Sequence, residues 1–205
     1  MRLHVGLLEE DELPRGLRPL VLEVSAGSET PLVRLFERLP RDITADRLDR
    51  RRFLLSGPAE ALRNLIRENM DLKFAKGLLG YLLQWEPDLV ADLRPRHGLI
   101  PPQDLAFSLL PREEVKNLSP ALKARHLYFG VEFRGPESAA IEILKSRLPF
   151  EIYGEPGGER RIVLSANLAD LLVYLVKPLM ESSNLKDEAQ GLLEALRKEA
   201  PECLG

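Results

Sequence analysis

The order of apolar and polar positions along the chain occurs twice. Residues 18–70 align with residues 127–179 at a constant offset of 109 without a gap, and eleven of the aligned positions are identical. The match resumes in AKGLLGYLLQWEP (75–87) and AQGLLEALRKEAP (189–201), after five extra residues in the second copy. A repeat on this scale indicates two supersecondary units of the same design. We therefore expect an internal duplication, in which each copy helps to interpret the other.

The first part of each copy predicts a strand followed by a helix. PLVLEV (19–24) and YFGVEF (128–133) are rich in β-forming residues, and each contains one glutamate at the same point. Apolar residues then recur at the spacing of one helix face. These residues are Leu32, Leu35, Phe36 and Leu39 in the first copy, and Ile141, Leu144 and Leu148 in the second.

The second part of each copy predicts a hairpin and two helices. RDIT and RRFLLS flank a turn in the first copy, and FEIY and RRIVLS flank a turn rich in Gly and Pro in the second. DLLVYLV (170–176) fits a buried strand or a buried helix equally well, but its counterpart EALRNLI (60–66) is amphipathic, so we expect both to be helical. An upstream strand within residues 2–9 is expected to pair back onto residues 19–24.

These elements predict an α+β fold with an internal duplication of a β-α-β-β-α-α unit, in a pseudo-two-fold arrangement with a proline-rich connector. The expected organisation is a first repeat unit with an extra N-terminal strand at 1–87, a structured connector at 88–126 and a second repeat unit at 127–205. Positions that stay apolar in both copies predict the core. They are Leu35, Leu39, Leu55, Leu62, Leu79, Leu144, Leu148, Leu164, Leu171 and Leu193.

Composition narrows the class of protein. The chain has 205 residues and a formal net charge of −3, which argues against a general nucleic-acid coat. Cys203 is the single cysteine, so no disulfide forms within the chain, and we expect a cytoplasmic protein with no export signal and no membrane span. The excess of Arg over Lys suits a thermophile, and equally a GC-rich genome.

Metal, cofactor and nucleophile motifs are not found in the sequence. His4, His97 and His126 lie far apart, and one cysteine cannot build a thiolate site. The sequence contains no phosphate-cradling Gly-rich loop, no nucleophile elbow and no HExxH motif. We predict no catalytic residues, no metal and no cofactor. A site assembled from scattered carboxylates and arginines would leave no such pattern.

A mirrored RRxxLS block is the main candidate polar site. It places Arg51, Arg52 and Ser56 in the first copy, and Arg160, Arg161 and Ser165 in the second. A serine between a strand and a helix start can cap the helix. The free N–H groups of a helix start, with a nearby guanidinium, can also bind an anion. Both interpretations remain open.

The two copies differ in apolar content in two of their helices. Phe74, Tyr81, Leu83 and Trp85 stand where the second copy has charge or Ala, whereas Val173 and Tyr174 replace polar or smaller residues of the first. Apolar residues on several faces of a helix must be covered. The cover is either the connector, which offers Leu99, Ile100, Phe107 and Leu109, or a protein surface of a homodimer or partner.

The function that we favour is a non-enzymatic intracellular scaffold or regulatory subunit acting through protein–protein contact. The first alternative is a binding module for a phosphate ligand, nucleotide or nucleic acid that uses the mirrored arginines. The second is an enzyme with its site in a groove between the repeats.

Overall fold

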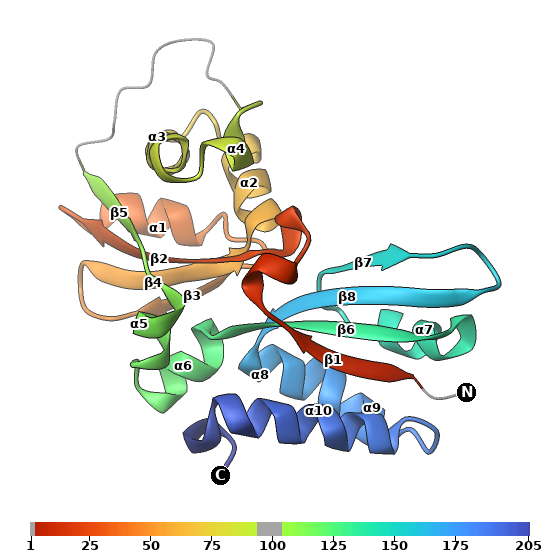
Figure 1. The fold of residues 1–205 in the computed structure, drawn as a ribbon. Coiled ribbons are helices and arrows are strands. Elements are labelled where there is room, and N and C mark those ends of the chain that lie inside the picture. Colours follow the sequence, from red (N-terminus) through yellow and green to blue (C-terminus); the bar gives the residue numbers. More distant parts are fainter. Residues whose placement is uncertain (1–2, 94–103) are drawn as a thin grey trace. The chain divides into compact units, whose positions relative to one another are not determined.

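The computed structural model describes residues 3–93 and 104–205. It is an α+β fold with two four-stranded antiparallel sheets, each accompanied by helices (Figure 1). The chain divides into two compact units. Unit 1 comprises Met1–Pro19 and Arg112–Gly205, and unit 2 comprises Leu20–Pro111. Part of the predicted connector, including Leu99 and Ile100, lies outside the described residues.

Unit 2 contains a sheet with the strand order β3-β4-β2-β5. Its strands are β2 (Pro19–Ala26), β3 (Thr44–Arg47), β4 (Arg52–Pro58) and β5 (Leu105–Leu109), and its helices are α1 (Thr30–Phe36), α2 (Ala59–Glu68), α3 (Lys73–Trp85) and α4 (Pro87–Val90). The core between sheet and helices is continuous and includes Leu22, Leu35, Phe53 and Leu79.

Unit 1 contains a sheet with the strand order β1-β6-β8-β7. Its strands are β1 (His4–Leu8), β6 (Tyr128–Pro136), β7 (Phe150–Tyr153) and β8 (Glu159–Asn167). Its helices are α5 (Arg112–Lys116), α6 (Pro120–His126), α7 (Glu137–Leu144), α8 (Leu168–Leu171), α9 (Lys177–Glu181) and α10 (Lys186–Glu199), with a π-helical turn η3 (Leu172–Val176) and three short 3-10 turns, η1 (Glu10–Glu12), η2 (Arg15–Leu17) and η4 (Pro201–Cys203). Helix α10 packs against β1, and α7 packs against β6 and β8 (Figure 1).

Each unit contains the predicted order of a strand, a helix, two strands and further helices. The register of the central strands also agrees. The backbone N–H of Ala26 donates to the carbonyl of Arg51 at 2.9 Å, and Gly135 pairs with Arg160, each 109 residues further on. The central strand pairs β2–β4 and β6–β8 are therefore aligned in the same way.

The outer hairpin strands differ between the units, although the sequences align without a gap. In unit 2 the strand is Thr44–Arg47 rather than the expected RDIT (41–44), and Thr44 pairs with Ser56. The offset of 109 would place the partner of Ser165 at residue 153, but the backbone N–H of Ser165 donates to Pro149, four residues earlier. The tight turn of the first hairpin and the wider turn of the second, with positive φ at Gly154 and Gly157, account for this shift.

The expected pairing of the N-terminal strand with residues 19–24 is wrong. β1 pairs antiparallel with β6, and β5, which lies in the predicted connector, pairs antiparallel with β2. Leu13 and Leu17, between β1 and β2, are buried against Val163 of β8, and this contact holds the segment on unit 1. The two units consequently do not follow the expected boundaries at 87 and 126.

The segment 170–176 is helical, as its counterpart indicated. It continues α8 as a π-helical turn, in which the N–H of Lys177 donates to the carbonyl of Leu172. Pro178 has no N–H to donate to the carbonyl of Tyr174, which favours this local rearrangement. Val173 and Tyr174 are exposed, so the described residues do not bury the segment on all sides, and cover by a homodimer or partner stays a prediction.

The predicted core is largely correct. Seven of the ten leucines are buried and the other three, Leu39, Leu144 and Leu193, are half-buried. The face of α7 was misassigned, since Ile141 is exposed whereas Ala140 and Ile143 are buried. That helix begins at Glu137, directly after Pro136. This is two residues earlier than the offset from Thr30 would place it, so its buried face is rotated.

Candidate functional site

The second arginine of each predicted block forms an ion pair with the glutamate that marks the first strand of its copy. Both Nε and Nη2 of Arg161 donate to Oε2 of Glu132, at 2.9 and 2.7 Å. In unit 2, Nη1 of Arg52 lies 3.3 Å from Oε1 of Glu23. Each pair joins neighbouring strands diagonally, which is a stabilising arrangement for opposite charges on one sheet face.

Glu132 is the more enclosed of the two glutamates. Its side chain also accepts a hydrogen bond from Nε of Arg134, and Arg161 lies over the ring of Tyr153 at 5.2 Å from the centroid. Hydrogen bonding from Arg161, reinforced by Arg134, lowers the pKa of the Glu132 carboxyl below its ordinary value of 4.5. The carboxylate is thus charged at neutral pH and held between two guanidinium groups.

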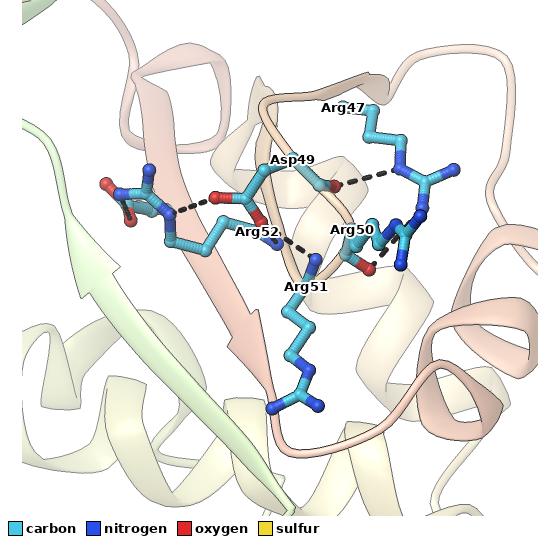
Figure 2. A network of polar contacts seen from close by, with 6 residues as sticks. Arg47, Asp49, Arg50, Arg51 and Arg52 are labelled. Atoms are coloured by element: carbon cyan, nitrogen blue, oxygen red, sulfur yellow. Dashed lines mark hydrogen bonds and ion pairs between the residues drawn. The ribbon is translucent and has the colours of Figure 1, made fainter.

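The loop between β3 and β4 is organised by one carboxylate, as Figure 2 shows. Oδ1 of Asp49 accepts hydrogen bonds from the backbone N–H groups of Arg51 and Arg52, at 2.8 and 2.9 Å, and Oδ2 accepts from Nε of Arg52 at 2.7 Å. These bonds lower the pKa of Asp49, the Arg51 N–H contributing most. Arg47 closes the loop by donating to the carbonyl of Asp49. The guanidinium of Arg51 points away from Asp49 (Figure 2).

The predicted anion-binding residues divide between the units, with Arg51, Arg52 and Ser56 in unit 2 and Arg160, Arg161 and Ser165 in unit 1. Ser56 and Ser165 are fully buried within their strands, and the helix cap after β8 is Asn167, whose Oδ1 accepts the N–H of Asp170 at 2.8 Å. Arg160 donates to the carbonyl of Gly154 and to Glu137, and so closes the second hairpin loop. The guanidinium groups of Arg52 and Arg161, which a bound phosphate would need, already form ion pairs with carboxylates.

The predicted interface residues differ in how far they are exposed. Phe74, with 2% of its surface exposed, belongs to the core of unit 2 and is not available to a partner. Tyr81 and Leu83 are half-buried against that core. Trp85 is 58% exposed, with its ring centroid 6.2 Å from that of Tyr81, so the described residues leave it uncovered, and its cover by a homodimer or partner stays a prediction. Val173 and Tyr174 are exposed on η3.

Unit 1 has an apolar edge strand that was not predicted from the sequence. β7 ends the sheet of unit 1, and its residues Phe150, Ile152 and Tyr153 are 38, 43 and 39% exposed. The strand in the same position of the other sheet, β3, reads TADR and carries Asp46 and Arg47 at its edge. Charged residues protect sheet edges from pairing with other chains, and β7 lacks that protection at Phe150 and Ile152.

The direction of the backbone groups of β7 follows from one hydrogen bond. The N–H of Ser165 donates to the carbonyl of Pro149 at 3.3 Å. The backbone groups of Glu151 and Tyr153, two and four residues further on, therefore also point toward β8. Backbone groups alternate along a strand, so the N–H and C=O groups of Phe150 and Ile152 face outward. Their side chains lie together on one sheet face because they are two residues apart. The alternation in FEIY indicates a strand with two different faces, and the edge position follows only from the strand order of the sheet.

In residues 3–93 and 104–205, no group of three or more His, Cys, Asp and Glu side chains is arranged to hold a metal ion. No helix in the same ranges has the length and apolar character to cross a membrane. Comparison of the chain with known protein families and with curated proteins finds no match.

Proposed function

We propose that the chain is a non-enzymatic scaffold or regulatory subunit that acts through protein–protein contact, with β7 as a contact strand. The observation that carries the proposal is the open edge of β7, where outward backbone groups coincide with the exposed side chains of Phe150 and Ile152. A partner strand added there would satisfy the backbone groups and cover the side chains.

The energetics favour a covered edge. Apolar surface removed from water contributes roughly 25 cal/mol per Å², and the outward N–H and C=O groups of an edge strand can hydrogen-bond to a partner strand. β3 supplies an internal comparison, because Asp46 and Arg47 stand at the edge that occupies the same place in its sheet. The contrast supports a specific use of the β7 edge.

Three further exposed side chains support a role in protein contact. Val173 and Tyr174 lie on a π-helical turn, a feature that is frequent at functional sites. Trp85 is exposed at the end of α3, and aromatic residues are enriched in protein interfaces. The proposal retains the cytoplasmic location that the single cysteine favours.

The proposal includes an internal duplication followed by divergence of the two outer edges. It is supported by the common strand order, by the common register of the central strands and by the Glu–Arg pair in each unit. Under this proposal one copy kept a charged edge strand and the other acquired an apolar one.

Affinity capture with matched baits tests the proposal. The baits are the wild-type protein, the double variant Phe150→Lys/Ile152→Lys and the control Val33→Lys, which changes an even more exposed apolar residue on α1. We expect proteins that are retained by the wild type and the control to be lost from the double variant. Identical capture by all three baits would overturn the role of β7.

A further inference from the structure

Helix α3 caps the free edge of β5 in unit 2. The N–H of Leu110 donates to the carbonyl of Val21 at 2.7 Å, so the neighbouring N–H of Leu109 points away from β2. The hydroxyl of Tyr81 accepts that N–H at 2.7 Å, and the Tyr81 ring lies 6.3 Å from the ring of Phe107. One tyrosine therefore satisfies the edge and fills the space beside it.

The equivalent edge in unit 1 lacks this tyrosine. β1 pairs with β6 as β5 pairs with β2, so that Leu7 lies opposite Val131 where Leu109 lies opposite Leu22. In the alignment of the last helices, Ala195 of α10 stands at the position of Tyr81. The consequence is a groove of about 320 Å³ between β1 and α10, lined by Leu3, His4, Val5, Gly6, Leu7, Asp187, Glu188, Gly191, Leu192 and Ala195.

Two residues of β1 direct their backbone groups away from β6. The backbone N–H of Ser165 points toward β7, so the backbone groups of the next residue, Leu164, point toward β6. Leu164 pairs with Val131 of β6, and the backbone groups of Val131 therefore point toward β8. By alternation Gly130 faces β1, and on β1 the backbone groups of Val5 and Leu7 point outward. A Cβ placed on Gly191 would meet no atom within 4 Å, so α10 leaves room for side chains of an added strand.

The groove has an acidic rim at one end. Asp187 and Glu188 line it, and Glu188 and Leu3 also line an adjoining hollow of about 850 Å³. Glu142 and Glu181 contribute to that hollow, together with Ser138 and Ser182. Among the described residues Glu142 is paired with Lys145, at 2.7 Å, and no basic side chain lines either space except His4.

We propose that the groove between β1 and α10 binds an extended, basic segment of a partner protein as an added strand. The backbone of the segment forms hydrogen bonds with the outward N–H and C=O groups of Val5 and Leu7. One of its apolar side chains lies over Gly191 and Ala195. A Lys or Arg of the segment lies close to Asp187 and Glu188. A second copy of this chain fits less well, because it would bring its own acidic rim into the same interface. The groove lies at the edge of the sheet opposite β7. The proposal therefore rests on the protein-contact function and extends it, and it can be disproved while the role of β7 stands.

Binding of a synthetic peptide tests the proposal. The probe is a fluorescein-labelled ten-residue peptide in which lysines flank alternating Val and Thr, and its binding is followed by fluorescence anisotropy. We expect Ala195→Tyr, which installs the capping side chain of unit 2, to weaken binding at least tenfold without lowering the melting temperature. A peptide with Glu in place of Lys should also bind at least tenfold more weakly.

Further measurements separate this edge from the others. Bound peptide should slow hydrogen exchange at the N–H of Leu7, and the β7 variant Ile152→Lys should bind the peptide as the wild type does. Equal affinity of Ala195→Tyr and wild type, protection at Phe150 instead of Leu7, or no binding at millimolar peptide would each overturn the proposal. A concentration-dependent dimer that Ala195→Tyr abolishes would assign the groove to a second copy and overturn it too.

Discussion

Arg161 and Glu132 form a two-bond ion pair across neighbouring strands, and the pair has a counterpart in Arg52 and Glu23 of the other unit. The same residues had suggested an anion site because two arginines precede a serine in each copy. The structure instead places a carboxylate of the adjacent strand against the guanidinium groups of Arg52 and Arg161. In each pair the arginine lies 29 residues after its glutamate, so the partner is not readable from local spacing.

The first prediction concerns the pH dependence of stability. The pKa of Glu132 is lowered in the folded state, so its contribution is fully present above the ordinary value of 4.5 and is lost as the pH falls below it through the folded pKa. Glu132→Gln should lower the free energy of unfolding by about 1 kcal/mol at pH 7, since Arg161 and Arg134 are partly exposed. Urea denaturation of both proteins should give a smaller difference at pH 3. A difference that does not change with pH would contradict the assignment.

The second prediction concerns the cap of α8. Oδ1 of Asn167 accepts the N–H of Asp170, and Asn167 is buried, so Asn167→Ala should lower the free energy of unfolding by about 1 kcal/mol. Asn167→Asp retains the accepting oxygen but sets a carboxylate against Oδ2 of Asp170, to which Nδ2 of Asn167 donates at 2.9 Å, so this variant should not recover the wild-type stability. Thermal denaturation measures both, and a silent Asn167→Ala variant would show that the cap contributes nothing.

The third prediction compares two core positions. Leu79 is fully buried in α3, whereas Leu193 of α10 is half-buried. Leu79→Ala should lower the free energy of unfolding by about 2–5 kcal/mol. Leu193→Ala should cost clearly less, because fewer contacts are lost. Equal losses in chemical denaturation would mean that the burial of the two positions is not as described.

Helix and strand types were well predicted where the two copies could be compared. The helical state of residues 170–176 came from the amphipathic counterpart at 60–66, and most of the core leucines were correctly assigned. The predicted boundaries of the hairpin strands were wrong where the residues of the turn determine them. The carboxylate of Asp49 closes the first hairpin tightly, and Gly154 and Gly157 open the second, so an ungapped alignment hid a shift of strand β3.

Strand pairing was the least predictable part of the fold. β1 precedes β2 in sequence, which favours a hairpin, yet it pairs with β6 because Leu13 and Leu17 anchor the intervening segment against Val163. The β7 edge was missed for a related reason. Phe150 and Ile152 looked like ordinary hairpin residues, and only the sheet order places them on an unpaired edge.

Site-specific photo-crosslinking tests the protein-contact function most directly. A photoreactive phenylalanine analogue is placed at Ile152 in β7, and in a second protein at Asp46 in β3, the charged edge that occupies the same place in its sheet. Each protein is irradiated in a lysate of its source cells. The account predicts a discrete protein adduct from position 152 and none from position 46. Adducts from position 46 alone, or none from position 152, would contradict it.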